Sequence, residues 1–318
     1  MKILMFGRGT INSLYGWAFE KSGHTVDFYV RPGRAAQYGS TVALDIRDGR
    51  VDPKGAPVRE EWPVSLREEL TADHDYDLIV VSVNHDQLSE AVAFLSARVG
   101  KATVLVFNNI LNDPAVELAP IPHEQVVWGF PGGGGGFSGN KLSGGFVKAV
   151  FLGKYGDSNR TGRYRTVRDL FRKTGFSVVE SSNFRNWLWF HFLVDAGLAA
   201  RGLKTDGMAH VLTSRSELEQ AILLMREALP LLKAKGGRGG LGGLIVSAAP
   251  AGLLSLAVQK YIGRGNDLPL FLIEQVEATA HGSREATSLY PRDVLAEARR
   301  LGVALPRLEA LEPFFRQE

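Results

Sequence analysis

The chain has 318 residues, of which 37 are basic and 34 acidic, giving a net charge of +3, and it contains no cysteine. This length favours two domains that each bury a core, and the lack of cysteine excludes disulfides, thiolate nucleophiles and cysteine-ligated metals. The charges are interspersed rather than gathered in a basic arm, which indicates a small, mildly anionic ligand rather than nucleic acid.

The first residues, MKILMFG, enter an apolar strand directly, without the features of a signal peptide, so we expect a cytoplasmic protein. Residues 241–258 are nearly uncharged, but glycines and Pro250 interrupt them. We therefore predict no membrane span there. A buried helix pair, a subunit contact or the wall of an apolar pocket is expected instead.

Short apolar runs alternate with amphipathic segments over residues 1–150, which is typical of βαβ units around a parallel sheet. Residues 40–60 indicate a hairpin or an irregular excursion. The other elements expected in this half are strands at 2–7, 25–30, 77–83, 103–108, 126–130 and 146–152, and helices at 13–22, 87–99 and 161–173.

Long helical patterns replace the strands from about residue 183 onward. Helices are expected at 183–201, 214–235, 267–280 and 290–301, with Gly302 as a C-terminal stop. The sequence thus predicts an α/β fold with an N-terminal Rossmann dinucleotide-binding domain, residues 1–181, and an all-helical C-terminal domain, residues 182–318.

The first predicted strand runs into a segment that carries the GxG half of the dinucleotide fingerprint, after a strand and before a helix. Gly7 would permit the tight turn, and Gly9 would let a pyrophosphate approach the helix N-terminus. Asn12 replaces the usual third glycine and either widens the helix–strand contact or turns its amide to the cofactor. The predicted cofactor-binding segment is Gly7-Arg8-Gly9-Thr10-Ile11-Asn12.

The end of the second predicted strand bears on the choice of cofactor, because NAD-binding proteins usually place a carboxylate there for the ribose hydroxyl. This chain instead has Arg31 and Arg34 and no carboxylate. Two guanidinium groups suit a 2′-phosphate, which arginine can bind in a fork of charged hydrogen bonds. The alternative is that both are solvated loop cations, but the sequence favours NADP(H).

Four segments together resemble the ketopantoate reductase family, as a divergent member: GRGTINSLYGWAFEKSGHTVDFYVRPGR, LIVVSVNHDQLSEAV, VLVFNN and FRNWLWFHFLVDAG. The resemblance covers essentially the whole chain, closely over the first 110 residues. It implies a Rossmann domain plus a helical domain, NADPH as hydride donor, and reduction of a 2-keto acid or related carbonyl in a cleft between them. Family habit and the apolar stretch 241–258 also suggest a homodimer.

The resemblance also carries over individual site residues. The family's cofactor glycines fall on Gly7 and Gly9, its 2′-phosphate arginine on Arg31, and its asparagine near nicotinamide and substrate on Asn109. The family's lysine after the preceding strand is Asn84 here, and its catalytic lysine aligns with His191. A later asparagine is replaced by Asp195, and Glu285 is nearest to the family's substrate carboxylate, one residue out of register.

His191 is a suitable proton donor for hydride transfer to a carbonyl or imine. Trp187 and Asp195 lie one helical turn to either side of it, on the same face. A carboxylate at this place would favour the imidazolium and orient it. We expect His191 and Asp195 to be catalytic and Trp187 to line the substrate pocket; a simple surface pair is the alternative.

Two glycine-rich runs have no fixed assignment from sequence. The first, within Phe130–Phe137, would be either an amide-rich loop with room for a bulky substrate or a mobile hairpin linker. The second, residues 236–243, is expected to be an interhelical linker. Four scattered histidines lack the spacing of metal ligands, so no metal is predicted: His85, His123, His210 and His281.

Three functions remain open at this point. The first is an NADPH-dependent reductase of a ketone, 2-keto acid or imine that is larger or less acidic than ketopantoate. The second is reduction of ketopantoate itself by a rearranged site. The third is an NADP-binding regulatory protein without turnover, because a fold does not dictate a function.

Overall fold

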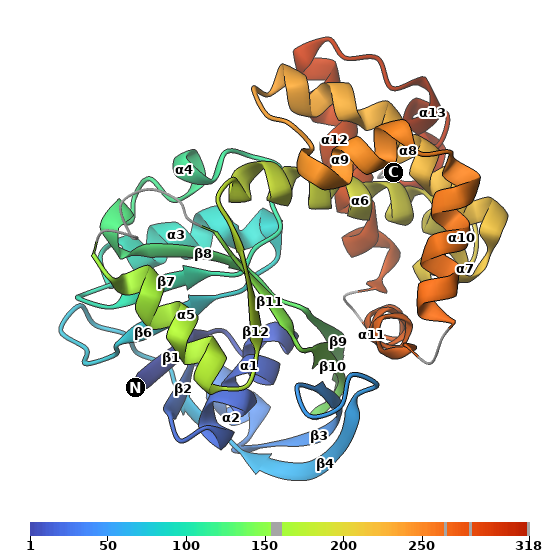
Figure 1. Ribbon diagram of the computed structural model, residues 1–318. Helices are drawn as coiled ribbons and strands as arrows, with labels where there is room; N and C mark the ends of the chain where they lie inside the picture. The colour runs from blue at the N-terminus through green and yellow to red at the C-terminus, as the bar shows by residue number, and fades with distance from the viewer. Residues whose placement is uncertain (154–160, 264–265, 280–281, 317–318) are drawn as a thin grey trace. The chain divides into compact units, whose positions relative to one another are not determined.

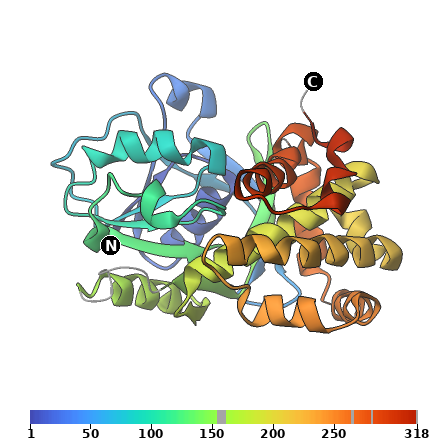
Figure 2. The ribbon, with the colours of Figure 1, turned by 90° about the horizontal axis from the view of Figure 1, so that it is seen from above.

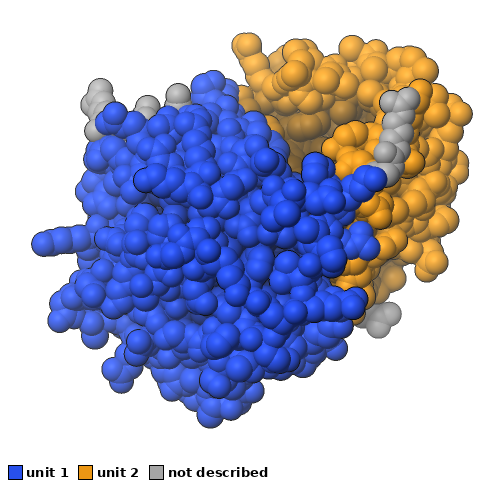
Figure 3. Space-filling view, turned by 60° about the horizontal axis from the view of Figure 1, so that its bottom comes forward, with its two compact units in different colours: residues 1–184 blue, residues 185–318 orange. Residues whose placement is uncertain are grey.

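The computed structural model describes residues 1–153, 161–263, 266–279 and 282–316. Its contacts divide the chain into two compact units, Met1–Phe184 and Arg185–Glu318, which are coloured separately in Figure 3. We call them unit 1 and unit 2. The division falls after residue 184, close to the boundary that the sequence suggests at 181.

The centre of unit 1 is an eight-stranded sheet with the order β12-β11-β8-β7-β6-β1-β2-β5. From β5 to β8 all neighbouring strands are parallel, whereas β11 is antiparallel to β8. This arrangement confirms the predicted Rossmann sheet. Its strands are β1 (Lys2–Phe6), β2 (Thr25–Tyr29), β5 (Ser65–Arg67), β6 (Leu78–Val81), β7 (Thr103–Val106), β8 (Val126–Phe130), β11 (Ala149–Gly153) and β12 (Ser177–Ser181).

Helices cover both faces of this sheet. Tyr15 of α1 (Thr10–Lys21) and Phe171 of α5 (Arg163–Lys173) meet edge to face at 5.9 Å, so these two helices share one face. Phe94 of α3 (Leu88–Ser96) packs against Phe6 and Tyr29 on the other face. Successive residues of β1 therefore place their side chains in the cores on opposite faces of the sheet, which explains why nearly the whole strand is apolar.

A second, four-stranded sheet with the order β4-β3-β10-β9 lies against α1, as Figure 1 shows. It consists of β3 (Thr41–Gly49), β4 (Ala56–Pro63), β9 (Gly133–Ser138) and β10 (Lys141–Val147). The pair β3–β4 is the hairpin suggested by residues 40–60. Because both sheets contact α1, that helix is buried over most of its circumference.

The first glycine-rich run is neither an open substrate loop nor a mobile linker. It forms most of β9, paired antiparallel with β10 from Gly133 opposite Phe146 to Ser138 opposite Lys141. A Cβ atom at Gly135 would lie 2.2 Å from the carbonyl oxygen of Ser143, so the two backbones pass too closely for side chains. The glycines therefore serve close strand packing.

Smaller differences from the predicted elements arise in the same region. The single strand expected over 146–152 is in fact the end of β10 followed by β11. The short helices α2 (Arg34–Tyr38) and α4 (Pro114–Glu117) were not predicted, since each is barely longer than one turn.

The described part of unit 2 is helical throughout, which confirms the second half of the predicted fold class (Figures 1 and 2). Gly302 ends α12 in the left-handed conformation, with φ at 68°, as expected for a C-terminal stop. Residue 280, the end of one predicted helix, lies outside the described residues. The helices are α6 (Phe184–Lys204), α7 (Gly207–Thr213), α8 (Arg215–Ala234), α9 (Gly240–Ala248), α10 (Ala251–Ile262), α11 (Leu268–Glu277), α12 (Arg284–Leu301) and α13 (Pro306–Glu309).

The apolar stretch 241–258 forms α9 and α10, with Pro250 between them. Half of the expected linker 236–243 is thus helical, and its Gly242 leaves room for Phe190, whose ring would lie 2.4 Å from a Cβ there. Arg226 donates to the carbonyl oxygens of Val246 and Ala249 at 2.8 and 2.5 Å and so caps the end of α9. Among the described residues, no helix is long and apolar enough to cross a bilayer.

Candidate functional site

The loop between β1 and α1 makes the turn that its sequence predicts. Gly7 has a φ of 95°, a conformation that glycine adopts without strain. Its N–H donates to the carbonyl oxygen of Tyr29 at 2.9 Å, which fixes the loop beside the end of β2. The loop therefore lies at the carboxyl edge of the parallel strands, where open α/β sheets bind their ligands.

Gly9 gives a direct test of whether this loop fits a pyrophosphate. Its φ of −74° is accessible to any residue, and an added Cβ would meet nothing nearer than the Ser82 carbonyl oxygen at 3.9 Å. The protein itself therefore has room for a side chain here. The lack of a side chain here leaves the backbone open to the close approach that a pyrophosphate requires.

The N-terminus of α1 is also suited to an anion. No side chain caps it and no acidic residue stands in its first turn, so its N–H groups can bind phosphate oxygens. Thr10 is buried, and within the described residues its hydroxyl has no hydrogen-bond partner. Ile11 is partly buried and packs against the core.

Asn12 does not point toward the place of a ligand. It is fully buried, and its Nδ2 donates to the carbonyl oxygens of Phe6 and Gly7 at 2.7 and 3.0 Å. These bonds stabilise the glycine turn from the buried side. The structure thus favours a supporting role for Asn12, the third-glycine position, over direct contact with the cofactor.

The two arginines after β2 are both exposed. Arg34 begins α2 and its Nη1 donates to Gln37 at 2.7 Å, while within the described residues no polar partner of the Arg31 guanidinium is found. A nearby carboxylate, that of Glu68, accepts from the Ala35 N–H at 2.8 Å. Arg31 is thus able to bind an anion at the end of β2.

Asn84 and Asn109 follow β6 and β7 at the same edge of the sheet. Asn84 is exposed at the start of a short 3₁₀ turn, and Asn109 is half-buried. The neighbouring Asn108, which the sequence did not single out, is buried and donates to the Val83 carbonyl oxygen at 2.6 Å. It joins the ends of β6 and β7 and so sets the position of Asn109.

In unit 2, α6 places His191 and Asp195 in contact. Nδ1 of His191 lies 3.1 Å from Oδ2 of Asp195, and the rings of His191 and Trp187 are 5.2 Å apart. The other aromatic residues of this helix serve packing, with Trp189 beneath Lys235 and Phe192 against Tyr290. The helical spacing therefore brings together the three residues that the sequence grouped.

Two opposing effects act on the pKa of His191. Burial disfavours the imidazolium, but the charge and hydrogen bond of the Asp195 carboxylate outweigh it, so the pKa is raised above its usual value. The side chain remains 31 % exposed and accessible. Such a group can hold a proton near neutral pH and still release it to a ligand.

Glu285 lies apart from this pair as far as the described contacts go. It is exposed in the first turn of α12, where Ser283 caps the helix by accepting from the Ala286 N–H at 3.3 Å. A carboxylate at this place stabilises the helix N-terminus. No described contact joins it to His191 or Asp195.

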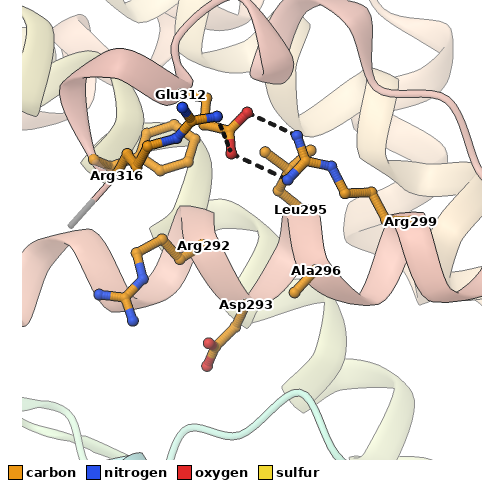
Figure 4. A pocket seen from close by; sticks show the side chains of 8 residues that line it. Arg292, Asp293, Leu295, Ala296, Arg299, Glu312 and Arg316 are labelled. Atoms are coloured by element: carbon orange, nitrogen blue, oxygen red, sulfur yellow. Dashed lines mark hydrogen bonds and ion pairs between the residues drawn. The ribbon is translucent and has the colours of Figure 1, made fainter. Parts of the chain in front are cut away.

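A pocket in unit 2 lies between α12 and the C-terminal segment (Figure 4). Glu312 accepts from Arg299 at 3.0 and 2.7 Å and pairs with Arg316 at 3.4 Å. These pairs attach the C-terminal segment to α12. None of the described residues that line this pocket is a predicted site residue.

Within the described residues no group of three acidic or histidine side chains could hold a metal ion. His281, one of the four scattered histidines, lies outside the described residues.

The fold defines a Rossmann-type α/β unit followed by a helical unit. Residues 3–138 match the family model described as Ketopantoate reductase PanE/ApbA. This match confirms over those residues the resemblance to the ketopantoate reductase family that the sequence predicts. A comparison with curated protein sequences gave no match.

Solved structures of related fold cover nearly the whole chain. A D-mandelate dehydrogenase with NADH and anilino(oxo)acetate is 16% identical, covers 99% of this chain and 97% of its own, and has a TM-score of 0.73. The PanE/ApbA family ketopantoate reductase from Ralstonia eutropha JMP134 is 17% identical, covers 99% of this chain and 97% of its own, and has a TM-score of 0.70. The 2-dehydropantoate 2-reductase from Methylococcus capsulatus is 18% identical, covers 98% of this chain and 95% of its own, and has a TM-score of 0.67. Both units thus share the fold of these proteins.

Proposed function

We propose that this protein is an NADPH-dependent reductase of a ketone, 2-keto acid or imine. The observation that carries the proposal is the glycine loop, where Gly9 has room for a side chain that it lacks. The family match over residues 3–138 supports the same cofactor class. The domains proposed for cofactor and substrate remain residues 1–181 and 182–318.

The cofactor, when bound, supplies a hydride. The chain's part is to hold it: the N–H groups at Gly9 and Thr10 bind the pyrophosphate, and Arg31 with Arg34 binds the 2′-phosphate. Asn109 positions the nicotinamide end, with Asn84 beside it on the next strand. The solved D-mandelate dehydrogenase contains NADH, so the preference for NADPH needs its own measurement.

His191 donates the proton that a reduced carbonyl oxygen or imine nitrogen requires. Asp195 orients the imidazole through the 3.1 Å contact and favours its protonated form, while Trp187 offers an aromatic surface beside it. A carboxylate next to the donor disfavours a second carboxylate there. We therefore propose a substrate that is less acidic than ketopantoate, or one large enough to keep its carboxylate away from Asp195, with Glu285 as a candidate contact.

The activity is tested by following NADPH consumption with ketopantoate, aryl 2-oxo acids, neutral ketones and cyclic imines offered separately, and NADH in parallel. We expect NADPH to be oxidised with an aryl or neutral substrate and to be oxidised little with ketopantoate. Ketopantoate as the best substrate would instead identify a 2-dehydropantoate 2-reductase. NADPH binding without turnover on any of them would favour a regulatory protein.

The helical unit further offers a surface for a second copy of the chain. Residues 239–259 contain no charged side chain, and Leu244 of α9 and Leu253 of α10 are 67% and 61% exposed. Apolar surface of this kind is usually covered in solution. A solved ketopantoate reductase from Staphylococcus aureus is described as dimeric, which supports a homodimer here.

We expect wild-type protein to sediment as a dimer, and Leu244→Glu with Leu253→Glu to sediment as a monomer, because charges at the interface would lose water without gaining a partner. Val51→Glu is the matched control, since Val51 is 75% exposed in unit 1 and should leave the dimer intact. A monomeric wild type at micromolar concentration would contradict the proposal.

A further inference from the structure

Arg8, the residue between the two loop glycines, is held by three separate elements of unit 1. Its guanidinium lies 4.5 Å from the ring centre of Tyr38, the last residue of α2, and 4.7 Å from that of Phe137 in β9. Its Nη1 donates to Oδ1 of Asn140, in the turn between β9 and β10, at 2.9 Å. Two rings and one amide therefore fix the plane of the guanidinium.

This cation has no counter-charge in the described part of the chain. Arg8 is 9% exposed, none of the described carboxylates lies within ion-pair distance of it, and its buried Nε has no hydrogen-bond partner there. Burial lowers the pKa of Arg8, with a smaller opposing effect of Tyr38, but an arginine stays charged at any ordinary pH. A buried, unpaired cation is costly, and an anion that binds beside it offsets that cost.

The contacts of Arg8 also locate the anion. Tyr38 stands four residues after Arg34 on α2, which is about 6 Å along a helix axis. Gly7 is bonded to Tyr29 at the end of β2. Arg8 is thus turned toward the end of β2, and this is the side where Rossmann folds bind the adenosine ribose rather than the nicotinamide.

We infer that Arg8 binds the 2′-phosphate of NADP(H) from within the glycine loop, while Tyr38, Phe137 and Asn140 hold its guanidinium in place. The inference rests on the proposed cofactor class. It adds a specificity-determining residue to Arg31, and it gives the second sheet a role in cofactor choice because Phe137 lies in β9 and Asn140 in the turn that joins β9 to β10. The two rings stabilise the cation, and the N–H groups of the guanidinium that Asn140 does not engage would donate to the phosphate.

The test is calorimetric binding of NADP+ and NAD+ to the full-length chain and its variants, which requires no substrate. Arg8→Met keeps the stem that packs between the rings and removes the charge. We expect it to weaken NADP+ binding by about tenfold to a hundredfold, since charged hydrogen bonds are lost, and to leave NAD+ binding within about threefold. The affinity for adenosine 2′,5′-bisphosphate, which carries the same 2′-phosphate, should fall by a similar factor.

Two further variants separate charge from packing. Phe137→Leu keeps the charge but removes one ring, so its loss of NADP+ affinity should be smaller and in the same direction. Arg163→Met is the control, because Arg163 bonds to the Lys101 carbonyl oxygen and Thr103 at the opposite end of β7. It should bind both dinucleotides normally.

Equal weakening of NADP+ and NAD+ binding by Arg8→Met would overturn the inference and assign Arg8 to the pyrophosphate or to loop structure. Unchanged NADP+ binding would overturn it too. A wild-type chain that binds neither dinucleotide would refute the proposed function itself. If the wild type binds NADP+ tightly but shows no turnover, the Arg8 inference is still tested, because the binding measurement needs no substrate.

Discussion

Replacing His191 with alanine is expected to lower kcat by about 10²- to 10⁴-fold, the usual contribution of a positioned general acid. NADPH affinity should stay the same, because His191 lies in unit 2 and the residues proposed to hold the cofactor lie in unit 1. The measurement is NADPH consumption with the best substrate of the panel, together with direct titration of NADPH. His210→Ala is the control, since His210 is an exposed histidine of the same unit.

The contact with Asp195 makes this prediction dependent on pH. A general acid works while it is protonated, so activity is present below the pKa of His191 and is lost as the pH rises through it. Asp195 raises that pKa. Asp195→Asn should therefore move the alkaline limb of kcat/KM to lower pH, a shift that loss of packing alone would not produce.

Full activity of His191→Ala at all pH values would remove His191 from the mechanism. An alkaline limb that stays in place in Asp195→Asn would assign the limb to another group. A fall in kcat together with a fall in NADPH affinity would instead indicate a structural role of α6.

The sequence predicts the pair on α6 and the loop at β1 well for the same reason. Both depend on residues close together in the chain: His191 and Asp195 are one helical turn apart, and Gly7 follows directly on an apolar strand. Local spacing decides these geometries. The surroundings of Arg8, in contrast, come from residues 38, 137 and 140, and no local pattern connects segments so far apart.

The glycine run of β9 shows the same limit at the level of the fold. Consecutive glycines are typical of loops when only their own propensity is considered, because glycine lacks a side chain to pack in a strand. In the structure the close approach of Gly135 to Ser143 on β10 makes glycine necessary. A pairing partner outside the run overrides its local propensity, as tertiary context often does in sheets.

The end of β3 carries a buried ion pair that the sequence did not single out. Asp48 and Arg50 at the end of β3 have side chains that are 3% and 10% exposed, with Nη2 at 2.7 Å from Oδ2. Arg50 also donates to the Thr174 carbonyl oxygen at 2.9 Å and lies 5.3 Å from the ring centre of Trp17 on α1. Arg50 thus connects the end of β3 to α1 and to the turn after α5.

We expect Arg50→Met to lower the free energy of unfolding of unit 1 by about 3–5 kcal/mol, because it leaves the Asp48 carboxylate buried without its partner. Arg59→Met should cost less than about 1 kcal/mol, since its pair with Asp45 is mostly solvated, with Arg59 81% exposed. Urea unfolding followed by tryptophan fluorescence measures both.

The double variant Asp48→Asn with Arg50→Met decides the cause of the loss. If an unpaired buried charge is responsible, neutralising the carboxylate should recover part of the stability that Arg50→Met removes. If the loss comes from Arg50's packing on Trp17, the double variant should be no more stable than the single one. Recovery would mean that the cost of Arg50→Met is mainly that of a buried carboxylate left without its partner at the end of β3.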